Sequence, residues 1–319
     1  MTIVRRILGR IDGHIMAPIP PGRLGAVRVL CGGFAMIYLF LRVKNLLGYA
    51  HFRPTQFQPV GLVAWLLDRP LPAWAVIAAT LATTLLSVPF FLGWRFRIVG
   101  PLFAALFLWT LSYRHSWGMI FHTDNLLVFH VAILGLARSA DAWSLDARRP
   151  ASSPPVAGNG RYSWPLHAMA WVTVLAYVLA GLAKLQDGGL DWLQGNDLRN
   201  FIAADNARKI LLGDIHSPLA APLMHWTGFF KALAMLTLVV ELGAPIALVH
   251  ARLAAAWIVL AIGFHFGVLA LMMIVFPYQM FGIAFACFLP VDRLFDRIAR
   301  RIRRVENPAS DPAESARPQ

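Results

Sequence analysis

Long apolar runs recur along the whole chain, and their length constrains its fold more than any other feature. A helix that crosses a bilayer core needs about 20 mostly apolar residues. Mean hydropathy of +0.60 and a charged fraction of 14% lie outside the range of soluble globular proteins. The runs lack the alternation of barrel strands, so helices are the structure that satisfies their backbone groups in lipid. They cover residues 24–42, 72–94, 98–113, 117–137, 163–184, 227–249, 253–276 and 279–291.

These runs predict an all-α fold, a polytopic transmembrane helical bundle of about eight spans with a short last span. The sequence has 29 Lys and Arg against 16 Asp and Glu, and arginines cluster at its two ends. Under the positive-inside rule both the N and the C terminus are cytoplasmic, which requires an even number of spans. Because topology accounts for these charges, the expected partners are membrane lipids with anionic headgroups, and no nucleic acid. The clustered arginines are Arg5, Arg6, Arg10 and Arg23 before the first run, and Arg293, Arg297, Arg300, Arg301, Arg303 and Arg304 after the last.

The chain divides into three predicted regions around the apolar runs. A basic cytoplasmic N-terminus covers 1–23, the transmembrane domain covers 24–291, and a basic, partly disordered cytoplasmic tail covers 292–319. Two amphipathic stretches, 58–69 and 197–215, are predicted to lie on the outer membrane surface.

Ionisable and polar groups at membrane depth are costly, so each one is a candidate functional residue. His122 and Asn125 are three residues apart and share a helix face, so they can act on one ligand. The predicted topology places them in the outer half of the bundle together with Arg114 and Lys184. The alternative is that such groups join helices by hydrogen bonds, and we expect this of His130. The complete set is Arg28, His122, Asp124, Asn125, His130, Lys184, Glu241 and His265.

Glu241 and His265 lie in the middle of two neighbouring runs, in VVELGAP and GFHFG. Their depth allows them to face each other across the helix interface. A mutual ion pair or hydrogen bond is the expected structural explanation for both residues.

Lys184 ends an apolar run in the segment AGLAKLQDGGLDWLQG, residues 180–195, and two interpretations stay open. A lysine at a helix end commonly extends its ammonium to the headgroups and serves as an anchor. Held away from water, its amine is favoured in the neutral form and acts as a base. A neutral amine beside a histidine can take a proton from a phenol or hydroquinone. No metal site is expected, because the sequence lacks HExxH, CxxC and paired HxxxH motifs.

Three stretches together resemble the membrane domain of the vitamin K-dependent gamma-carboxylase family, which is also called the HTTM domain. Residues 116–146, SWGMIFHTDNLLVFHVAILGLARSADAWSLD, are similar to an aromatic entry followed by a histidine at the start of a span. Residues 177–195, YVLAGLAKLQDGGLDWLQG, are similar to a span that ends in Ala-Gly-x-x-Lys-Leu and continues to Asp-Trp. A weaker similarity covers 241–249 and 263–277, and the resemblance extends from the first span to Pro290.

The resemblance implies a chemistry for the candidate residues. In carboxylases of this family the lysine deprotonates reduced vitamin K, oxygen converts the hydroquinone into a strong base, and CO2 adds to a glutamate. Lys184 takes the position of that catalytic base, and His122 that of the histidine in contact with the quinone. The cofactor implied is a reduced, vitamin K-like quinone. The residues that complete the candidate ligand site are Asn125, Trp192, His265, Arg114 and Glu241.

The sequence also departs from the carboxylases. Ala183 precedes Lys184 where the carboxylases have a second lysine, and the path from Lys184 to Trp192 is longer. No large soluble region follows the last span, so protein carboxylation is not expected.

Three functional hypotheses remain. The first is a quinol-dependent, carboxylase-like membrane enzyme in a bacterial inner membrane. The second is a non-catalytic scaffold or accessory subunit for an unidentified membrane or periplasmic protein. The third is a transporter or lipid carrier, which the lack of broken helices in corresponding halves disfavours.

Overall fold

The computed structural model describes residues 18–148 and 160–306, except for the side chains of His122, Leu190 and 303–306. Throughout these ranges the chain forms helices, turns and loops, without a strand. The predicted all-α fold is therefore confirmed. The first part of the predicted N-terminal region, and the tail beyond 306, lie outside the described residues.

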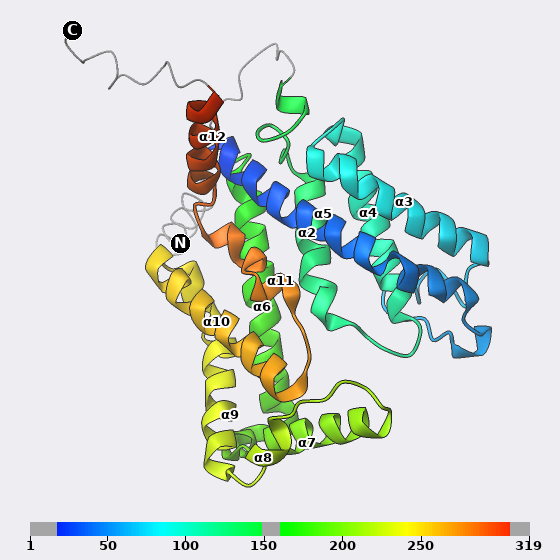
Figure 1. The fold of residues 1–319 in the computed structure, drawn as a ribbon, viewed down its shortest axis with the longest axis vertical. Helices are drawn as coiled ribbons and strands as arrows, with labels where there is room; N and C mark the ends of the chain where they lie inside the picture. Colours follow the sequence, from blue (N-terminus) through cyan, green and yellow to red (C-terminus); the bar gives the residue numbers. More distant parts are fainter. Residues whose placement is uncertain (1–17, 149–159, 307–319) are drawn as a thin grey trace, which may run out of the picture.

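Among residues 18–148 and 160–306, six helices are long and apolar enough to cross a membrane (Figure 1). The first is α2 (Pro21–Gly48), extended to His51 by a 3₁₀ turn. The fifth is α9 (Thr227–Leu242), continued by the 3₁₀ helix η6 (Ala244–Leu248). The others are α3 (Ala73–Leu92), α4 (Phe96–His115), α6 (Ser163–Gly188) and α10 (Ala251–Met272).

Two predicted spans take a different form, so the count of eight is not confirmed. In place of a helix over 117–137, the structure has a loop, a 3₁₀ turn and the short apolar helix α5 (Asn125–Leu136). Gly118 in this loop has φ of 86°, a conformation that a helix does not accommodate. The predicted last span consists of α11 (Pro277–Met280) and the 3₁₀ helix η7 (Ile283–Phe288). Gly282, with φ of 72°, separates the two.

Close packing of apolar and small residues joins the helices. The largest cluster of buried residues runs through α2, α4, α5, α6, α10 and η7. Between α4 and α5 the backbones nearly touch, because a Cβ on Gly100 would lie 2.7 Å from the Gly135 oxygen. Small residues at such crossings are typical of helix packing in membranes.

Buried polar side chains add interhelical bonds to this packing. His130 on α5 is fully buried, and its Nδ1 lies 2.8 Å from the Tyr278 hydroxyl while its Nε2 lies 3.1 Å from Thr173 Oγ1. The histidine therefore joins α5 to α6 and α11, as expected from the sequence.

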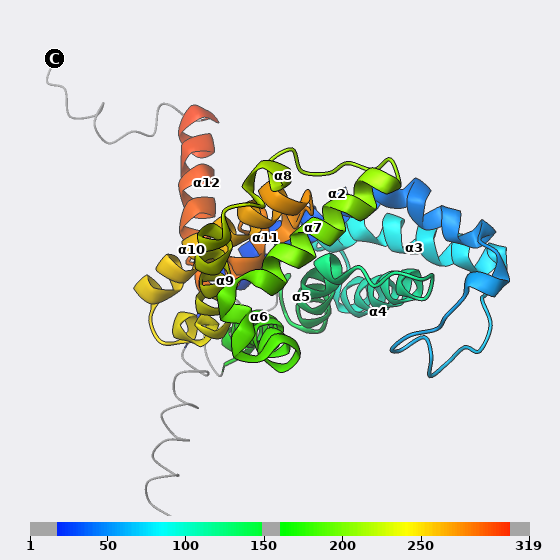
Figure 2. The same cartoon turned by 90° about the horizontal axis from the view of Figure 1, so that it is seen from below.

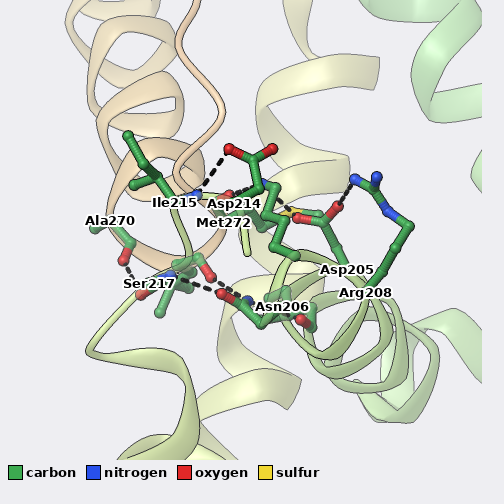
Figure 3. A network of polar contacts seen from close by, with 11 residues as sticks. Asp205, Asn206, Arg208, Asp214, Ile215, Ser217, Ala270 and Met272 are labelled. Carbon is green, nitrogen blue, oxygen red and sulfur yellow. Dashed lines mark hydrogen bonds and ion pairs between the residues drawn. The ribbon is translucent and has the colours of Figure 1, made fainter. Parts of the chain in front are cut away.

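The amphipathic stretch at 197–215 forms α7 (Asn196–Leu211), which lies across one end of the bundle (Figures 1 and 2). The other stretch, 58–69, consists mainly of turns and forms no helix. α7 is bonded to the C-terminal end of α10, whose last carbonyl groups lack partners within the helix. Figure 3 shows how polar side chains of α7 and the segment after it gather at this end.

Three consecutive carbonyl groups at the end of α10 each receive a side-chain donor. Ser217 Oγ donates to the Ala270 oxygen at 2.6 Å, and Asn206 Nδ2 donates to the Leu271 oxygen at 2.9 Å. Lys209 Nζ donates to the Met272 oxygen. Asn206 Oδ1 in turn accepts the backbone N–H of Ser217 at 2.7 Å, which fixes the connecting segment. α7 is therefore a cap on α10 held in place by directed bonds.

Candidate functional site

The end of α6 next to α7 brings Lys184 together with groups from two other helices. Lys184 and Tyr177 lie two helical turns apart on α6, so they share one face. Between them Gly181 faces α9, and a Cβ there would lie 2.8 Å from Leu242 Cδ2 and 3.1 Å from Glu241 Cβ. The glycine lets α6 and α9 approach closely at the level of Glu241.

Lys184 forms an ion pair with Glu241 across this contact. Its Nζ lies 2.7 Å from Glu241 Oε1, and the side chains are 24% and 3% exposed, respectively. The amine also lies 3.4 Å from the oxygen of Ala180 in its own helix. Lys184 therefore turns toward α9, and the carboxylate it meets is almost fully removed from the protein surface.

Tyr177 extends the same face with a second polar contact. Its hydroxyl lies 2.6 Å from Nε2 of His265 on α10, a histidine that is 5% exposed. The ring of Phe276 lies 4.7 Å from the His265 ring, centroid to centroid. Three helices thus contribute to one polar cluster, which we call the Lys184 cluster: Tyr177, Lys184, Glu241 and His265.

The pairing within the Lys184 cluster differs from the sequence prediction. Glu241 and His265 were expected to bond each other, but Glu241 bonds Lys184 and His265 bonds Tyr177. Sequence analysis missed Tyr177 altogether. Its position two turns before Lys184 was the available signal, because residues at that spacing lie on one helix face.

Two buried atoms of the Lys184 cluster have no hydrogen-bond partner among the described residues. They are Glu241 Oε2 and His265 Nδ1. Buried polar atoms in native proteins are bonded in the great majority of cases, so unmatched atoms of this kind mark strain, a catalytic role, or contact with water, an ion or a ligand.

Trp192 closes one side of the cluster. The 3₁₀ helix η5 (Gly189–Gln194) begins at Gly189, whose φ of 56° turns the chain back after α6. The Trp192 ring is buried, and its centroid lies 5.7 Å from Lys184 Nζ. Its Nε1 donates to Thr237 Oγ1 at 3.3 Å, one turn before Glu241 on α9. The Trp192 ring therefore lies beside the Lys184 ammonium, and its predicted contact with a ligand stays a prediction.

Arg114 lies in a separate group with Tyr38 and Asp124. Arg114 Nη1 lies 2.6 Å from Asp124 Oδ2 and 2.7 Å from the Tyr38 hydroxyl. Tyr38 donates to the same carboxylate oxygen at 2.6 Å, and the Phe121 ring centroid lies 3.5 Å from the guanidinium carbon. These bonds join α2 and α4 to the start of α5.

The remaining predicted residues lie beside this second group. Asn125 is the first residue of α5 and is half-buried. His122 is in the 3₁₀ turn before it, and its side chain lies outside the described part of the chain. Figure 1 shows the start of α5 and the end of α6 at the same end of the bundle. Contact of His122 with the Lys184 cluster stays a prediction.

The described residues contain no group of three or more His, Cys, Asp or Glu side chains arranged to hold a metal ion. The site therefore consists of an ion pair, a tyrosine, a histidine and aromatic rings. Such groups can bind an aromatic ligand with hydroxyl groups and exchange protons with it.

Comparison with known proteins places the chain in a family. No curated protein and no solved structure matches the chain. The family model described as the HTTM domain matches residues 16–292, which include all six candidate spans and the Lys184 cluster. Together with its apolar helices, this match identifies the chain as an integral membrane protein that belongs to the HTTM domain family.

Proposed function

We propose that the protein is a quinol-activating enzyme of a bacterial inner membrane, in which Lys184 removes a proton from a reduced, vitamin K-like quinone. The observation that carries the proposal is the buried Lys184–Glu241 pair, whose second carboxylate oxygen has no partner among the described residues; the same holds for Nδ1 of His265 in this cluster. A pair that served only to join helices would gain from bonding both atoms.

Glu241 gives the proton a destination. An ammonium at Lys184 cannot accept a second proton, but it can pass its own proton to Glu241 Oε1 along the 2.7 Å contact. The amine then takes the hydroxyl proton of the quinol. The balance is a quinolate, a protonated Glu241 carboxyl group and a restored Lys184 ammonium, which stabilises the quinolate by its charge. Amines and phenols both have ordinary pKa values of about 10, so this second transfer is nearly balanced. The uphill step is the first one, from the ammonium to a carboxylate of ordinary pKa about 4, and burial of the pair favours it because burial disfavours both charges.

His265 and Trp192 orient the ring of the ligand in this proposal. Because the Tyr177 hydroxyl can donate to His265 Nε2, a neutral His265 carries its proton on Nδ1 and offers it to a quinol oxygen. Trp192 provides an aromatic surface beside the amine. His122 is the predicted further contact. A quinolate is oxidised by molecular oxygen more readily than a quinol, so oxygen uptake reports the deprotonation.

A scaffold function is the second candidate, and the same bonds favour it. Lys184–Glu241 and Tyr177–His265 join α6 to α9 and to α10, which is the role of many interhelical polar contacts in membranes. The scaffold would support an unidentified membrane or periplasmic protein and would have no need of a neutral amine.

Oxygen uptake with reduced naphthoquinone separates the two candidates. We expect the purified protein in nanodiscs to consume oxygen, and Lys184→Arg to lower the rate by about 100-fold or more, as loss of a general base does. The guanidinium can keep the ion pair with Glu241 but does not deprotonate. Lys231→Ala is the matched control, because Lys231 on α9 is exposed. Equal rates for the native protein and Lys184→Arg would contradict the proposal, as would no quinol-dependent uptake.

A further inference from the structure

The helix after the last apolar segment carries an exposed apolar stripe. In α12 (Asp292–Glu306), the side chains of Leu294, Ile298 and Ile302 are 57%, 51% and 52% exposed. They lie four residues apart, so they form one line along the helix. Exposed isoleucine and leucine in such a line are unfavourable in water and indicate an apolar surface that covers them.

Two of the arginines of α12 border this stripe, and two lie farther round the helix. Four of them are exposed, and the only acidic residue between them is Asp296. At about 100° per residue, Arg297 and Arg301 border the stripe on one side, whereas Asp296 lies on the opposite face. The four exposed arginines are Arg293, Arg297, Arg300 and Arg301.

A ring contact near the start of α12 joins this helix to the bundle. The ring of Phe295 packs edge-on against Trp143 at 5.4 Å between centroids. Just before the helix, the Cys287 oxygen accepts a hydrogen bond from Arg23 Nη2 at 3.2 Å. Phe295 lies at one edge of the face that carries Leu294, Ile298 and Ile302. Those three side chains stay more than half exposed beside this contact, so the bundle leaves them available to another partner. Figures 1 and 2 show α12 beside the start of α2, extending beyond the bundle.

The end of the bundle next to α12 is itself basic. Arg28 bonds the end of α3 and the segment after α5, and Asp146 of that segment accepts the backbone N–H of Arg95 at 2.9 Å. The α3–α4 connection and the segment after α5 therefore meet near Trp143, the contact of α12. Their exposed arginines are Arg95, Arg97, Arg138 and Arg148.

We propose that α12 lies on the surface of an anionic phospholipid bilayer, with Leu294, Ile298 and Ile302 at the acyl boundary and Arg297 and Arg301 at the phosphates. Because the six candidate spans cross a bilayer, α12 lies close to a bilayer surface, which makes this surface the expected partner of the stripe. A basic helix with an apolar face binds in the plane of such a surface, and anionic headgroups complement its arginines. This proposal is independent of the quinol chemistry.

A fluorescent label on the stripe tests the proposal in the full-length protein. Ile298→Cys is labelled with an environment-sensitive fluorophore, while the native Cys31 and Cys287 are buried and free. Nanodiscs contain phosphatidylcholine alone or with phosphatidylglycerol. We expect emission at shorter wavelength in the anionic nanodiscs, with a smaller shift at high salt because counterions screen the arginines. The matched control is Asp296→Cys on the opposite face, whose label is expected to report water in both.

Arg297→Gln with Arg301→Gln should reduce the shift of the Ile298 label without moving the Asp296 label. An Ile298 label that reports water in both nanodiscs would overturn the proposal. A shift that requires two protein copies in one nanodisc, whatever the lipid, would also overturn it and identify a second chain as the partner. All labelled and substituted side chains are exposed, so folding does not depend on them.

Discussion

Arg28 and Lys184 are two cations inside the same helical bundle, yet their partners differ in kind. Arg28 on α2 is fully buried, and its donors within the described residues all go to neutral backbone carbonyl groups, those of Ser139, Phe90, Phe91 and Trp143. Lys184 on α6 meets a carboxylate, Glu241. A guanidinium among carbonyl groups has no group to which it can pass a proton, whereas an ammonium beside a carboxylate has one. The first arrangement suits a structural bond and the second suits proton transfer.

The Arg28 arrangement also recurs elsewhere in the structure. Phe90 and Phe91 belong to the last turn of α3, whose carbonyl groups lack partners within the helix. Arg28 therefore caps α3 as Lys209 and Asn206 cap α10. Polar side chains that cap helix ends are the structural device of this fold. The Lys184 cluster does not follow it, because its bonds join side chains of different helices to one another and cap no helix end.

Removal of Arg28 should give the largest loss of stability. Arg28→Met removes the side-chain donor from carbonyl groups at the end of α3 and in the segment after α5, and we expect the free energy of unfolding to fall by about 4 kcal/mol. Unfolding in mixed detergent micelles measures it. Arg97→Met, an exposed arginine of α4, is the control. A loss below about 1 kcal/mol for Arg28→Met would show that these bonds contribute little to the fold.

Removal of one partner of the Lys184–Glu241 pair should lower the free energy of unfolding by less than Arg28→Met does. The loss should also depend on which partner is removed. Lys184→Met leaves a carboxylate that is 3% exposed without a partner, and we expect a loss of about 3 kcal/mol. Glu241→Gln leaves an ammonium that is 24% exposed, so its loss should be smaller. The double variant should be more stable than Lys184→Met alone, because it contains no unpaired buried charge. Additive losses would mean that the two side chains are not coupled.

The sequence predicts the individual helices better than their relative rotation. The runs 72–94 and 163–184 agree closely with α3 (Ala73–Leu92) and α6 (Ser163–Gly188), because length and apolarity alone determine a span. The partner of Glu241 was not predictable in this way. It depends on which face of α9 meets α6, and that is set by the close approach at Gly181, a property of two helices together.

The same reasoning explains which site residues were found. Lys184 and Trp192 were predicted from one continuous segment, and the turn at Gly189 brings them together locally. Tyr177 was missed because a tyrosine within an apolar span is not by itself a candidate functional residue. Its importance depends on the contact with His265, which belongs to another helix.

Removal of one α10 cap should have an intermediate effect. Asn206→Ala frees the Leu271 carbonyl group and the Ser217 N–H, and we expect a loss of about 1 to 2 kcal/mol. Hydrogen exchange should become faster at the end of α10 and in the segment after α7, with little change in α3. Quinol-dependent oxygen uptake should be unchanged, since the cap does not contact Lys184 or Glu241 directly. Loss of uptake in a folded Asn206→Ala protein would contradict the division between capping and chemistry.

Tyr177→Phe should have a smaller effect on stability but a selective one on activity. Loss of a single neutral hydrogen bond lowers the free energy of unfolding by about 1 kcal/mol. His265 is then no longer oriented through Nε2, so we expect the KM for reduced naphthoquinone to rise. Tyr162→Phe is the matched control. The Tyr162 hydroxyl donates to Asp141 Oδ2 at 2.8 Å, and this bond lies outside the Lys184 cluster. Equal changes in KM for the two variants would remove Tyr177 from the site.

The smallest expected change in stability concerns Asp205 on α7. Its dependence on pH tests the helix-capping bonds, which we compare with the Lys184–Glu241 pair. Burial raises the pKa of Asp205, but the hydrogen bonds from Lys209, 2.7 Å away, and Arg208 outweigh burial and hold the pKa below its ordinary value. Because the folded pKa is depressed, this contribution is complete above the ordinary aspartate pKa of about 4 and is lost as the pH falls through the lower, folded value. We expect a change of about 0.5 to 1 kcal/mol, measured as faster hydrogen exchange in α7 at acid pH.

In the Asp205→Asn variant, α7 should exchange faster at neutral pH and lack this acid-dependent step. Since Lys209 also donates to the Met272 oxygen, the end of α10 should respond together with α7, whereas α3, capped by an arginine without a carboxylate partner, should not.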